Sequence, residues 1–569
     1  MIGKIRAVFS RKQKMKFIVL FFILFGGSLL EFMGVSLILP FVQLVMDPGA
    51  VENGWLAALN RSGDELLFLT GVLLMAVYIL KNVYLLGMKY VQVRFIFNNR
   101  LELSARLMKS YMKKPYTFHL EKNSSEILRS VTTDVNNLYD LLMDVIDLIS
   151  RLLMIGMLGI FLACKDLLLT LATVMLLGLC SFMYFQVMRK RTQAYGRQNQ
   201  LYNSRMIQAV SQALGGIKEI KILAREDYFV RAYVENGRCY ASSLKKSRIF
   251  QFMPGYLIET ACVCGVLGIV LYRLNGGTQA QELIPQLSVF AVAAFRLLPS
   301  VNQVNHLMSR ILFLMPSVDK IYEDLKEAGE KEVEKQQEKE TERFLKAETV
   351  SFRNVSFSYP GSKKEILKNV SVEIPLKSSF GFIGGSGAGK TTFIDLLLGL
   401  LEPDKGGVFY GEQNIRQYAE DWGRKLGYIP QNIYLADDTI RRNVAFGIPD
   451  SLIEEDKVWN ALEKAQLADF VRGMENGLNT RIGEVGVRLS GGQRQRIGIA
   501  RALYQEPEIL VLDEATSALD TDTEQAVMEA VEHLKGKCTL LMVAHRTSTL
   551  KGCEKIYRVE DQKVTPAIV

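Results

Sequence analysis

Six long apolar stretches within the first 315 residues constrain this chain more than any other feature of its sequence. They run roughly over 17–46, 65–88, 138–163, 167–188, 249–273 and 283–315. Each is long enough to cross a bilayer core of about 30 Å, which takes about 20 helical residues. Buried helices of a large soluble bundle are the alternative, but such helices are amphipathic, whereas these are apolar all round. We therefore predict six transmembrane helices.

The connections between these stretches alternate in length and charge. Those at 47–64, 164–166 and 275–282 are short and carry few basic residues. Those at 89–137 and 189–248 are long, rich in Lys and Arg, and helical in pattern. Because Lys and Arg gather in the cytoplasmic connections of membrane proteins, we place both long connections and both chain termini in the cytoplasm.

Charge and composition exclude several other classes of protein. The net charge is +9, but basic residues such as Lys12, Lys14 and Lys16 cluster just before the first apolar stretch, so we expect no nucleic-acid partner. Seven cysteines in 569 residues are too few for a disulfide framework. Four histidines make a metal centre with several histidine ligands improbable.

The second part of the chain has a different character. Residues 326–343 carry 12 charges in 18 positions and cannot bury a core, so we assign 326–347 as a charged linker. After it, 349–359 alternates as a strand does, and 508–513 and 539–544 are continuous apolar runs typical of parallel sheets. We therefore predict an α-helical membrane domain over 1–325, fused to an α/β nucleotide-binding domain over 348–569.

A glycine-rich loop identifies the nucleotide site within this second domain. Residues 384–391 fit the pattern G-x-x-x-x-G-K-[ST], between an expected strand and an expected helix. The backbone N–H groups of such a loop cradle phosphates, the lysine reaches the β- and γ-phosphates, and the hydroxyl that follows binds Mg²⁺. The residues expected to contact ATP here are Gly384, Gly385, Ser386, Gly387, Ala388, Gly389, Lys390, Thr391 and Thr392.

Two acidic residues end the apolar run at 508–513. Asp513 is expected to hold Mg²⁺, together with Thr391. Glu514 follows directly, and we interpret it as the carboxylate that polarises the attacking water. A solvated turn is the alternative for an Asp-Glu pair at a strand end.

A second candidate anion site lies at the start of an arginine-rich helical run. Ser490, Gly491, Gly492 and Gln493 would present backbone N–H groups at a helix N-terminus. By itself this segment could equally be a helix cap. Together with the phosphate loop, however, the sequence resembles the ATP-binding cassette (ABC) family, and within it the exporters in which six spans precede the cassette.

The resemblance implies roles for further residues. Tyr359 resembles the aromatic residue that stacks on adenine, and Gln431 the glutamine that contacts Mg²⁺ and the attacking water. Asp520 belongs to a segment that resembles the loop coupling two ATP sites, and His545 resembles the histidine that senses the γ-phosphate. Ser490 and Gly492 resemble the signature residues that clamp the ATP of the opposite subunit.

A chain with six spans and one cassette is half a transporter in this family. The resemblance therefore implies a head-to-tail homodimer that buries two ATP and hydrolyses them with Mg²⁺. Segments near 115–122 and 225–230, at the tips of the long connections, would dock into the cassettes.

We expect membrane lipids as partners and a lipid-like or amphipathic cargo, best fitted by a lipid-linked oligosaccharide. Arg296 and Arg310 are 14 residues apart, about four helical turns, and share one face of the sixth span. They would suit an anionic head group such as pyrophosphate, or alternatively pair with carboxylates of adjacent helices. Local segments resemble bacterial flippases of lipid-linked oligosaccharides, which implies the bacterial inner membrane. Exporters of lipids, peptides or drugs, and an ATP-gated channel, remain alternatives.

Overall fold

The computed structural model divides into two compact units, Met1–Lys114 with Lys122–Glu334, and Pro115–Glu121 with Lys335–Val569. The residues that it describes are 3–4, 9, 11–37, 41, 63–164, 167–275, 280–337, 346–362, 364–483, 486–514, 521–544, 550 and 552–567.

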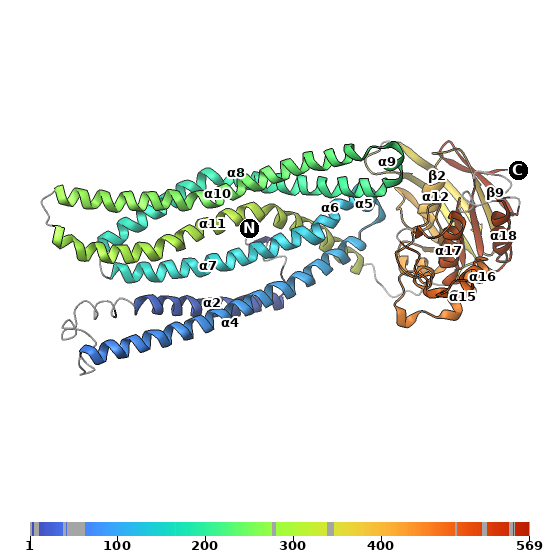
Figure 1. The fold of residues 1–569 in the computed structure, drawn as a ribbon. Coiled ribbons are helices and arrows are strands. Elements are labelled where there is room, and N and C mark those ends of the chain that lie inside the picture. The colour runs from blue at the N-terminus through green and yellow to red at the C-terminus, as the bar shows by residue number, and fades with distance from the viewer. Residues whose placement is uncertain are drawn as a thin grey trace. The chain divides into compact units, whose positions relative to one another are not determined.

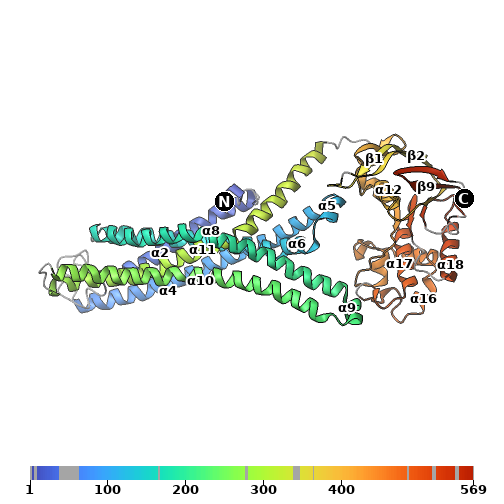
Figure 2. The ribbon, with the colours of Figure 1, turned by 90° about the horizontal axis from the view of Figure 1, so that it is seen from above.

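The first unit is built of helices. They are α2 (Arg11–Ser36), α4 (Gly63–Met112), α6 (Ser124–Arg129), the π-helical segment η3 (Ser130–Asp134), α7 (Val135–Ala163), α8 (Leu167–Gly215), α9 (Ile217–Leu223), α10 (Glu226–Asn275) and α11 (Ala280–Gln337). In Figures 1 and 2, α8 and α10 run side by side over most of their length, and the short α9 joins them at one end. Each of the six apolar stretches lies in one of the long helices, the first as far as Ser36.

Two of the described helices meet the length and composition of a membrane span, over Lys12–Gly34 and Leu67–Met112. The second exposes large apolar side chains on its surface, among them Phe68, Met75 and Leu86. Water penalises such a surface, whereas hydrocarbon does not. The α-helical membrane domain expected from the sequence is therefore present.

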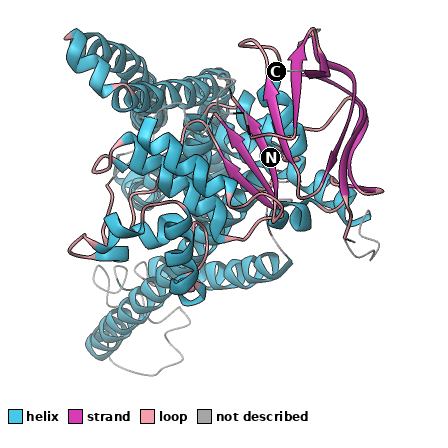
Figure 3. Cartoon of the chain, turned by 90° about the vertical axis from the view of Figure 1, so that its right-hand side faces the viewer, coloured by secondary structure: helices cyan, strands magenta, loops and turns pink. Residues whose placement is uncertain are grey.

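The second unit contains two β-sheets, drawn in magenta in Figure 3. The antiparallel sheet has the order β2-β1-β4-β5, formed by β1 (Thr349–Ser358), β2 (Glu365–Pro375), β4 (Lys405–Tyr410) and β5 (Gln413–Asn414). The larger sheet has the order β10-β9-β3-β8-β7-β6, formed by β3 (Ser379–Ile383), β6 (Leu426–Ile429), β7 (Ile509–Asp513), β8 (Thr539–Val543), β9 (Lys555–Glu560) and β10 (Lys563–Ala567). All its pairs are parallel except β9–β10.

The second unit also contains helices. They are α5 (Tyr116–Glu121), α12 (Lys390–Leu397), α13 (Ala419–Lys425), α14 (Ile440–Val444), α15 (Glu455–Lys464), α16 (Ala468–Arg472), α17 (Gly491–Tyr504) and α18 (Thr521–Glu532), with 3₁₀ turns at Asp450–Leu452 and Gly477–Asn479.

Strand β7 is buried on both faces, which explains why its sequence is a continuous apolar run. Ile509 and Val511 belong to a core shared with the antiparallel sheet and α12. Leu510 and Leu512 belong to a second core, which is shared with α14, α15 and α17. The two cores hold the carboxyl end of β7 in a fixed place, and the expected α/β fold is confirmed.

Candidate nucleotide and catalytic site

The phosphate loop joins β3 to α12, and its glycines are required by its geometry. Gly387 and Gly389 have positive φ angles of +77° and +105°, which side chains other than glycine rarely adopt. A Cβ on Gly384 would lie 2.4 Å from the carbonyl oxygen of Val559 in β9. Residues 385–387 are exposed, so the loop presents its backbone to an approaching anion.

Lys390 is the first residue of α12, and its side chain folds back over this loop. Its Nζ donates hydrogen bonds to the carbonyl oxygens of Gly384 at 2.9 Å and Gly385 at 3.1 Å. The ammonium group is therefore already held above the loop, where phosphate oxygens would replace the carbonyl oxygens as its partners. Thr391 is exposed on the next position of the helix.

The parallel strands place two carboxylates close to this loop. Asp513 ends β7, is buried, and pairs with Val543 of β8. The backbone N–H of Glu514 donates to the carbonyl oxygen of Val543 at 3.0 Å, and Glu514 has a left-handed backbone with φ of +51°. The Asp-Glu pair is therefore tied to the sheet and is not a freely solvated turn.

Gln431 follows β6, the neighbour of β7, and its exposed side chain reaches Glu514. Its Nε2 donates to the Glu514 Oε2 at 2.7 Å. On the same edge, the Tyr428 hydroxyl donates to the Asp513 Oδ2 at 3.5 Å. The carboxyl ends of β3, β6 and β7 thus bring Lys390, Asp513, Glu514 and Gln431 to one edge of the sheet, as ligand sites of open α/β sheets are built.

Burial sets the electrostatics of this edge. It raises the pKa of Asp513, and the neighbouring Glu514 charge raises it further, whereas the Tyr428 hydroxyl and Lys390 oppose that change. Asp395 lies one and a half turns into α12, and burial with the charge of Asp513 raises its pKa to about 6. A cation near these carboxylates would stabilise their charged forms.

Two further segments expected at the nucleotide have defined local contacts. The hydroxyl groups of Tyr359 and Thr392 lie 3.1 Å apart within hydrogen-bond distance, which fixes the ring beside the start of α12. Ser490 is the N-cap of α17 and makes a capping box with Gln493. Ser490 and Gly491 are exposed, so the N-terminus of α17 combines the expected helix cap with an open face.

Some expected site residues lie outside the part of the chain that the structure describes. Asp520 and His545 are among them. Arg296 lies on α11, but its side chain is outside the described part.

Arg310 of α11 is held between two carboxylates of α7. Its Nη2 lies 3.3 Å from the Asp140 Oδ2, and its Nε lies 3.2 Å from the Asp144 Oδ2. Asp144 is buried, with 4% of its side chain exposed. This is the pairing with carboxylates of an adjacent helix that the sequence analysis gave as an alternative. Asp140 and Asp144 were not identified from the sequence as the partners of Arg310. The i,i+4 spacing of Asp140 and Asp144, which puts both on one helix face, was the available signal.

The contact between Arg501 and Asn443 was also not predicted from the sequence. Asn443 is completely buried on α14, and Arg501 of α17 donates hydrogen bonds to it. An arginine within the apolar run Ile497–Leu503 was the signal that could have found this pair.

Comparison with known proteins identifies relatives of both units of the chain. Residues 367–517 match the family described as ABC transporter, and residues 9–290 match the ABC transporter transmembrane region. Among solved structures, a bacterial Atm1-family ABC exporter with ATP bound superposes with a TM-score of 0.78, at 21% identity, over 97% of this chain and 94% of that chain. That identity supports a likeness of fold alone.

Curated relatives include ATP-dependent lipid A-core flippases. That of Wigglesworthia glossinidia brevipalpis is 34% identical over 62% of this chain and 60% of the relative. That of Escherichia coli K12 is 30% identical over 66% of this chain and 64% of the relative. That of Cupriavidus metallidurans is 29% identical over 82% and 78%. The chain thus spans less than two thirds of the length of the first two relatives.

Proposed function

This chain belongs to the ABC transporter family, as an exporter-type membrane domain joined to a nucleotide-binding domain, and we propose on that premise that it hydrolyses ATP to move an amphipathic substrate across a membrane. The observation that carries the proposal is the 2.7 Å hydrogen bond from Gln431 to Glu514 beside the phosphate loop. A carboxylate in that position can accept a proton from a water that attacks the γ-phosphate.

The oxygen donors at this edge fit Mg²⁺. Asp513 offers a buried carboxylate, Thr391 an exposed hydroxyl and Gln431 an amide oxygen. Mg²⁺ favours such hard oxygen ligands, few in number, with the remaining positions filled by phosphate and water. When bound, the ion would neutralise charge that develops on the phosphate oxygens. Lys390 and the loop N–H groups would hold those oxygens in place.

Two chains are proposed to form the working unit. Ser490 and Gly491 present the open N-terminus of α17, and its backbone N–H groups suit a phosphate from outside the chain. In a head-to-tail homodimer, this terminus would complete the site built on the partner's phosphate loop. His545 is proposed to contact the γ-phosphate, and Asp520 to link the two sites.

The membrane arrangement follows the expectations from the sequence. We propose domains over 1–325 and 348–569 with a charged linker over 326–347, six spans, and both termini in the cytoplasm. The segment Pro115–Glu121 groups with the second unit, which supports a role in coupling the membrane domain to the cassette. Because the relatives are bacterial flippases, the bacterial inner membrane is the proposed location.

The proposed substrate is a lipid-linked oligosaccharide with a pyrophosphate head group. The relatives are flippases of lipid A-core, which supports a lipid substrate. Arg296 and Arg310 are proposed to meet the head group, and Arg310 would then exchange its carboxylate partners for phosphate oxygens. Export of other lipids, peptides or drugs is the alternative.

Transport in reconstituted vesicles tests this proposal. The full chain is inserted into liposomes with a fluorescent pyrophosphate-linked oligosaccharide lipid, or with labelled lipid A-core, and Mg-ATP is added outside. We expect the label to become protected from an external quencher only while ATP is hydrolysed, with no protection in Glu514→Gln. Movement without hydrolysis would indicate a channel. Transport of lipid A-core alone would replace the proposed substrate.

A further inference from the structure

Residues 433–436, which follow Gln431 and Asn432, are packed against other parts of the second unit. A Cβ on Gly498 of α17 would lie 2.3 Å from the Ile433 Cδ1, so Ile433 packs directly on the helix backbone. Leu435 is buried and lies close to Gly486. Only Asn432 separates Gln431 from this fixed stretch, which we call the anchored segment, Ile433–Ala436.

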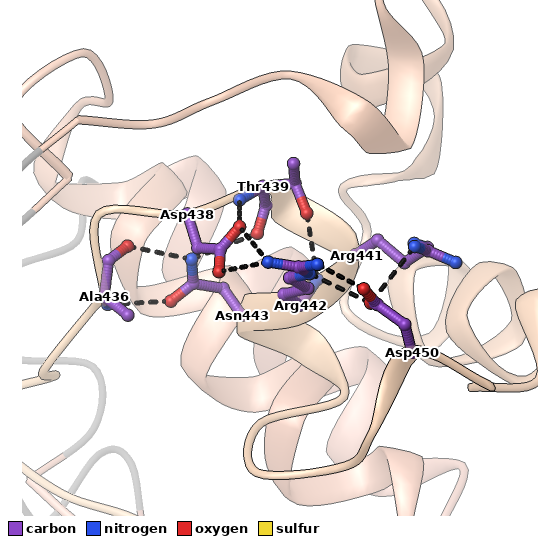
Figure 4. Close-up of polar contacts among 7 residues, drawn as sticks. All are labelled: Ala436, Asp438, Thr439, Arg441, Arg442, Asn443 and Asp450. Carbon is purple, nitrogen blue, oxygen red and sulfur yellow. Dashed lines mark hydrogen bonds and ion pairs between the residues drawn. The ribbon is translucent and has the colours of Figure 1, made fainter. Parts of the chain in front are cut away.

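A polar clamp holds the same segment. The buried Asn443 side chain accepts a hydrogen bond from the Ala436 N–H at 2.9 Å and donates to the Ala436 carbonyl at 3.0 Å. Figure 4 shows these two hydrogen bonds between Asn443 and Ala436. The ion pairs of Arg442 with Asp438 and Asp450 lie next to them.

Arg501 joins this clamp to α17. Its Nη1 donates to the Tyr434 carbonyl at 2.8 Å, its Nε donates to the Asn443 carbonyl at 2.8 Å, and its Nη2 donates to the Asn443 Oδ1 at 3.2 Å. The guanidinium also lies over the Phe446 ring, 4.5 Å from the centroid. The Arg501 side chain thus ties α17 both to Tyr434 in the anchored segment and to Asn443 in α14.

Arg501 makes no ion pair with a carboxylate among the described residues. Burial lowers its pKa, so the fold bears a cost for keeping a charge at this place. Arginine supplies several donors in a fixed planar fork, which lysine or an apolar residue does not. That geometry suits three acceptors that belong to Tyr434 and Asn443.

The geometry points to Arg501 as a positioning residue that acts through Gln431. We infer that Arg501 and Asn443 fix Gln431 relative to α17, so that the amide donor stays aligned with Glu514. Because Ser490 is the N-cap of α17, the position of this helix would set both its own N-terminus and Gln431. A misplacement of about 1 Å in such a group can cost about 10²-fold in rate. The inference rests on the proposed hydrolysis of ATP by this site.

A mutant cycle on the purified full chain in nanodiscs tests the inference. Arg501→Met, Gln431→Ala and the double variant are compared for kcat and KM of Mg-ATP hydrolysis. If Arg501 acts through Gln431, we expect Arg501→Met to lower kcat about tenfold or more, with KM within about twofold of wild type. The double variant should then be no slower than Gln431→Ala. Effects that multiply in the double variant would overturn the inference.

Arg496→Met is the matched control. Arg496 lies on the same helix and donates one hydrogen bond, to the Gln466 carbonyl at 2.9 Å, away from the anchored segment. It should therefore keep kcat near the wild-type value. Arg501→Lys retains the charge and the aliphatic stem and should give an intermediate kcat; it replaces Arg501→Met in the cycle if that variant does not fold. If neither folds while Arg496→Met does, Arg501 serves folding alone and the inference is wrong.

A second readout separates this inference from the proposed function. Wild-type turnover, and its loss in Glu514→Gln, decide whether the site hydrolyses ATP. Independently, Gln431→Cys and Glu514→Cys are joined by a short bis-maleimide in a chain whose native cysteines are replaced by serine. Because Glu514→Cys removes the proposed base, the crosslink is measured without hydrolysis, and Arg501→Met should reduce its yield. An unchanged yield would contradict the inference even if wild-type ATPase activity is found.

Discussion

The amide nitrogen of Gln431 donates a 2.7 Å hydrogen bond to the carboxylate of Glu514, although 83 residues separate the two in the chain. The contact forms because β6 and β7 are parallel neighbours, so the residues that follow both strands meet at one edge. The hydrogen bond orients the carboxylate at the edge of the sheet beside the phosphate loop. The predictions below depend on this edge and on the helices behind it.

Replacement of Glu514 by Gln should stop turnover without weakening ATP binding. The variant removes the base but keeps the size of the side chain, so phosphate release should fall about 10²–10⁴-fold. ATP-bound dimers should accumulate, measured by crosslinking of the cassettes. Glu508→Gln is the control, because Glu508 precedes the same strand and pairs with Lys425. Near-wild-type turnover in Glu514→Gln would show that another group is the base.

Replacement of Lys390 by Ala should weaken nucleotide binding itself. The lost ammonium contacts are charge-assisted, worth about 1.5–3 kcal/mol, which corresponds to roughly a 10- to 150-fold rise in the Kd for ATP. Equilibrium binding of a fluorescent ATP analogue measures it. Lys368→Ala, at an exposed lysine paired with Glu365, should bind as wild type does. Unchanged affinity in Lys390→Ala would contradict the assignment of the phosphate loop.

Asp395 should make the nucleotide-binding domain more stable at mildly acidic pH. Its pKa is about 6 in the folded chain, above the ordinary 3.8, so the folded state takes up a proton first as the pH falls. The cost of its buried charge, roughly 1–3 kcal/mol, is therefore present above pH 6 and is relieved between pH 6 and 4. Asp395→Asn should raise the Tm at pH 7.5, with a smaller gain at pH 5.

Asp421→Asn, at an exposed position of α13, is the control for this experiment. Its Tm should follow that of wild type at both pH values. If the gain from Asp395→Asn is the same at pH 7.5 and pH 5, the effect comes from packing and the electrostatic explanation is wrong.

Arg310 should prove important for stability and for substrate response, and its two roles can be separated. Arg310→Ala leaves the buried Asp144 without its guanidinium and should lower stability by roughly 1–3 kcal/mol. Adding Asp140→Asn and Asp144→Asn should restore the Tm. In that triple variant, basal ATPase should persist while stimulation by the pyrophosphate-linked lipid is lost, as also expected for Arg296→Ala. Full stimulation of the triple variant would remove Arg310 from the substrate site.

The sequence was sufficient for the fold class and for the main elements of the nucleotide site. Apolar length identified the helices, and the glycine pattern placed Lys390 at the start of the helix that follows β3, because both signals are local. The contact between Gln431 and Glu514 could not be derived from spacing, since it depends on the order of strands in the sheet. The functional roles of all the expected site residues, Asp520, His545 and Arg296 among them, stay predictions.

Long-range partners were the part that pattern reasoning could not supply. Arg310 was expected on one face of its helix, but its contacts with Asp140 and Asp144 depend on which helix packs beside it. The partners of Arg501 were equally unpredictable. A single arginine in an apolar run does not reveal whether its guanidinium binds a carboxylate, a carbonyl oxygen or water. Such residues bind across elements distant in sequence, where hydrophobic periodicity carries no information.

The left-handed backbone at Glu514 carries a thermodynamic consequence. A residue with a Cβ at φ of +51° costs roughly 1–2 kcal/mol relative to a relaxed conformation, and glycine would avoid that cost. Replacing Glu514 by glycine would thus increase the free energy of unfolding, although it removes the carboxylate. Glu514→Gly should have a higher Tm than wild type and no ATPase activity. A variant library screened for heat resistance alone would therefore select this inactive variant.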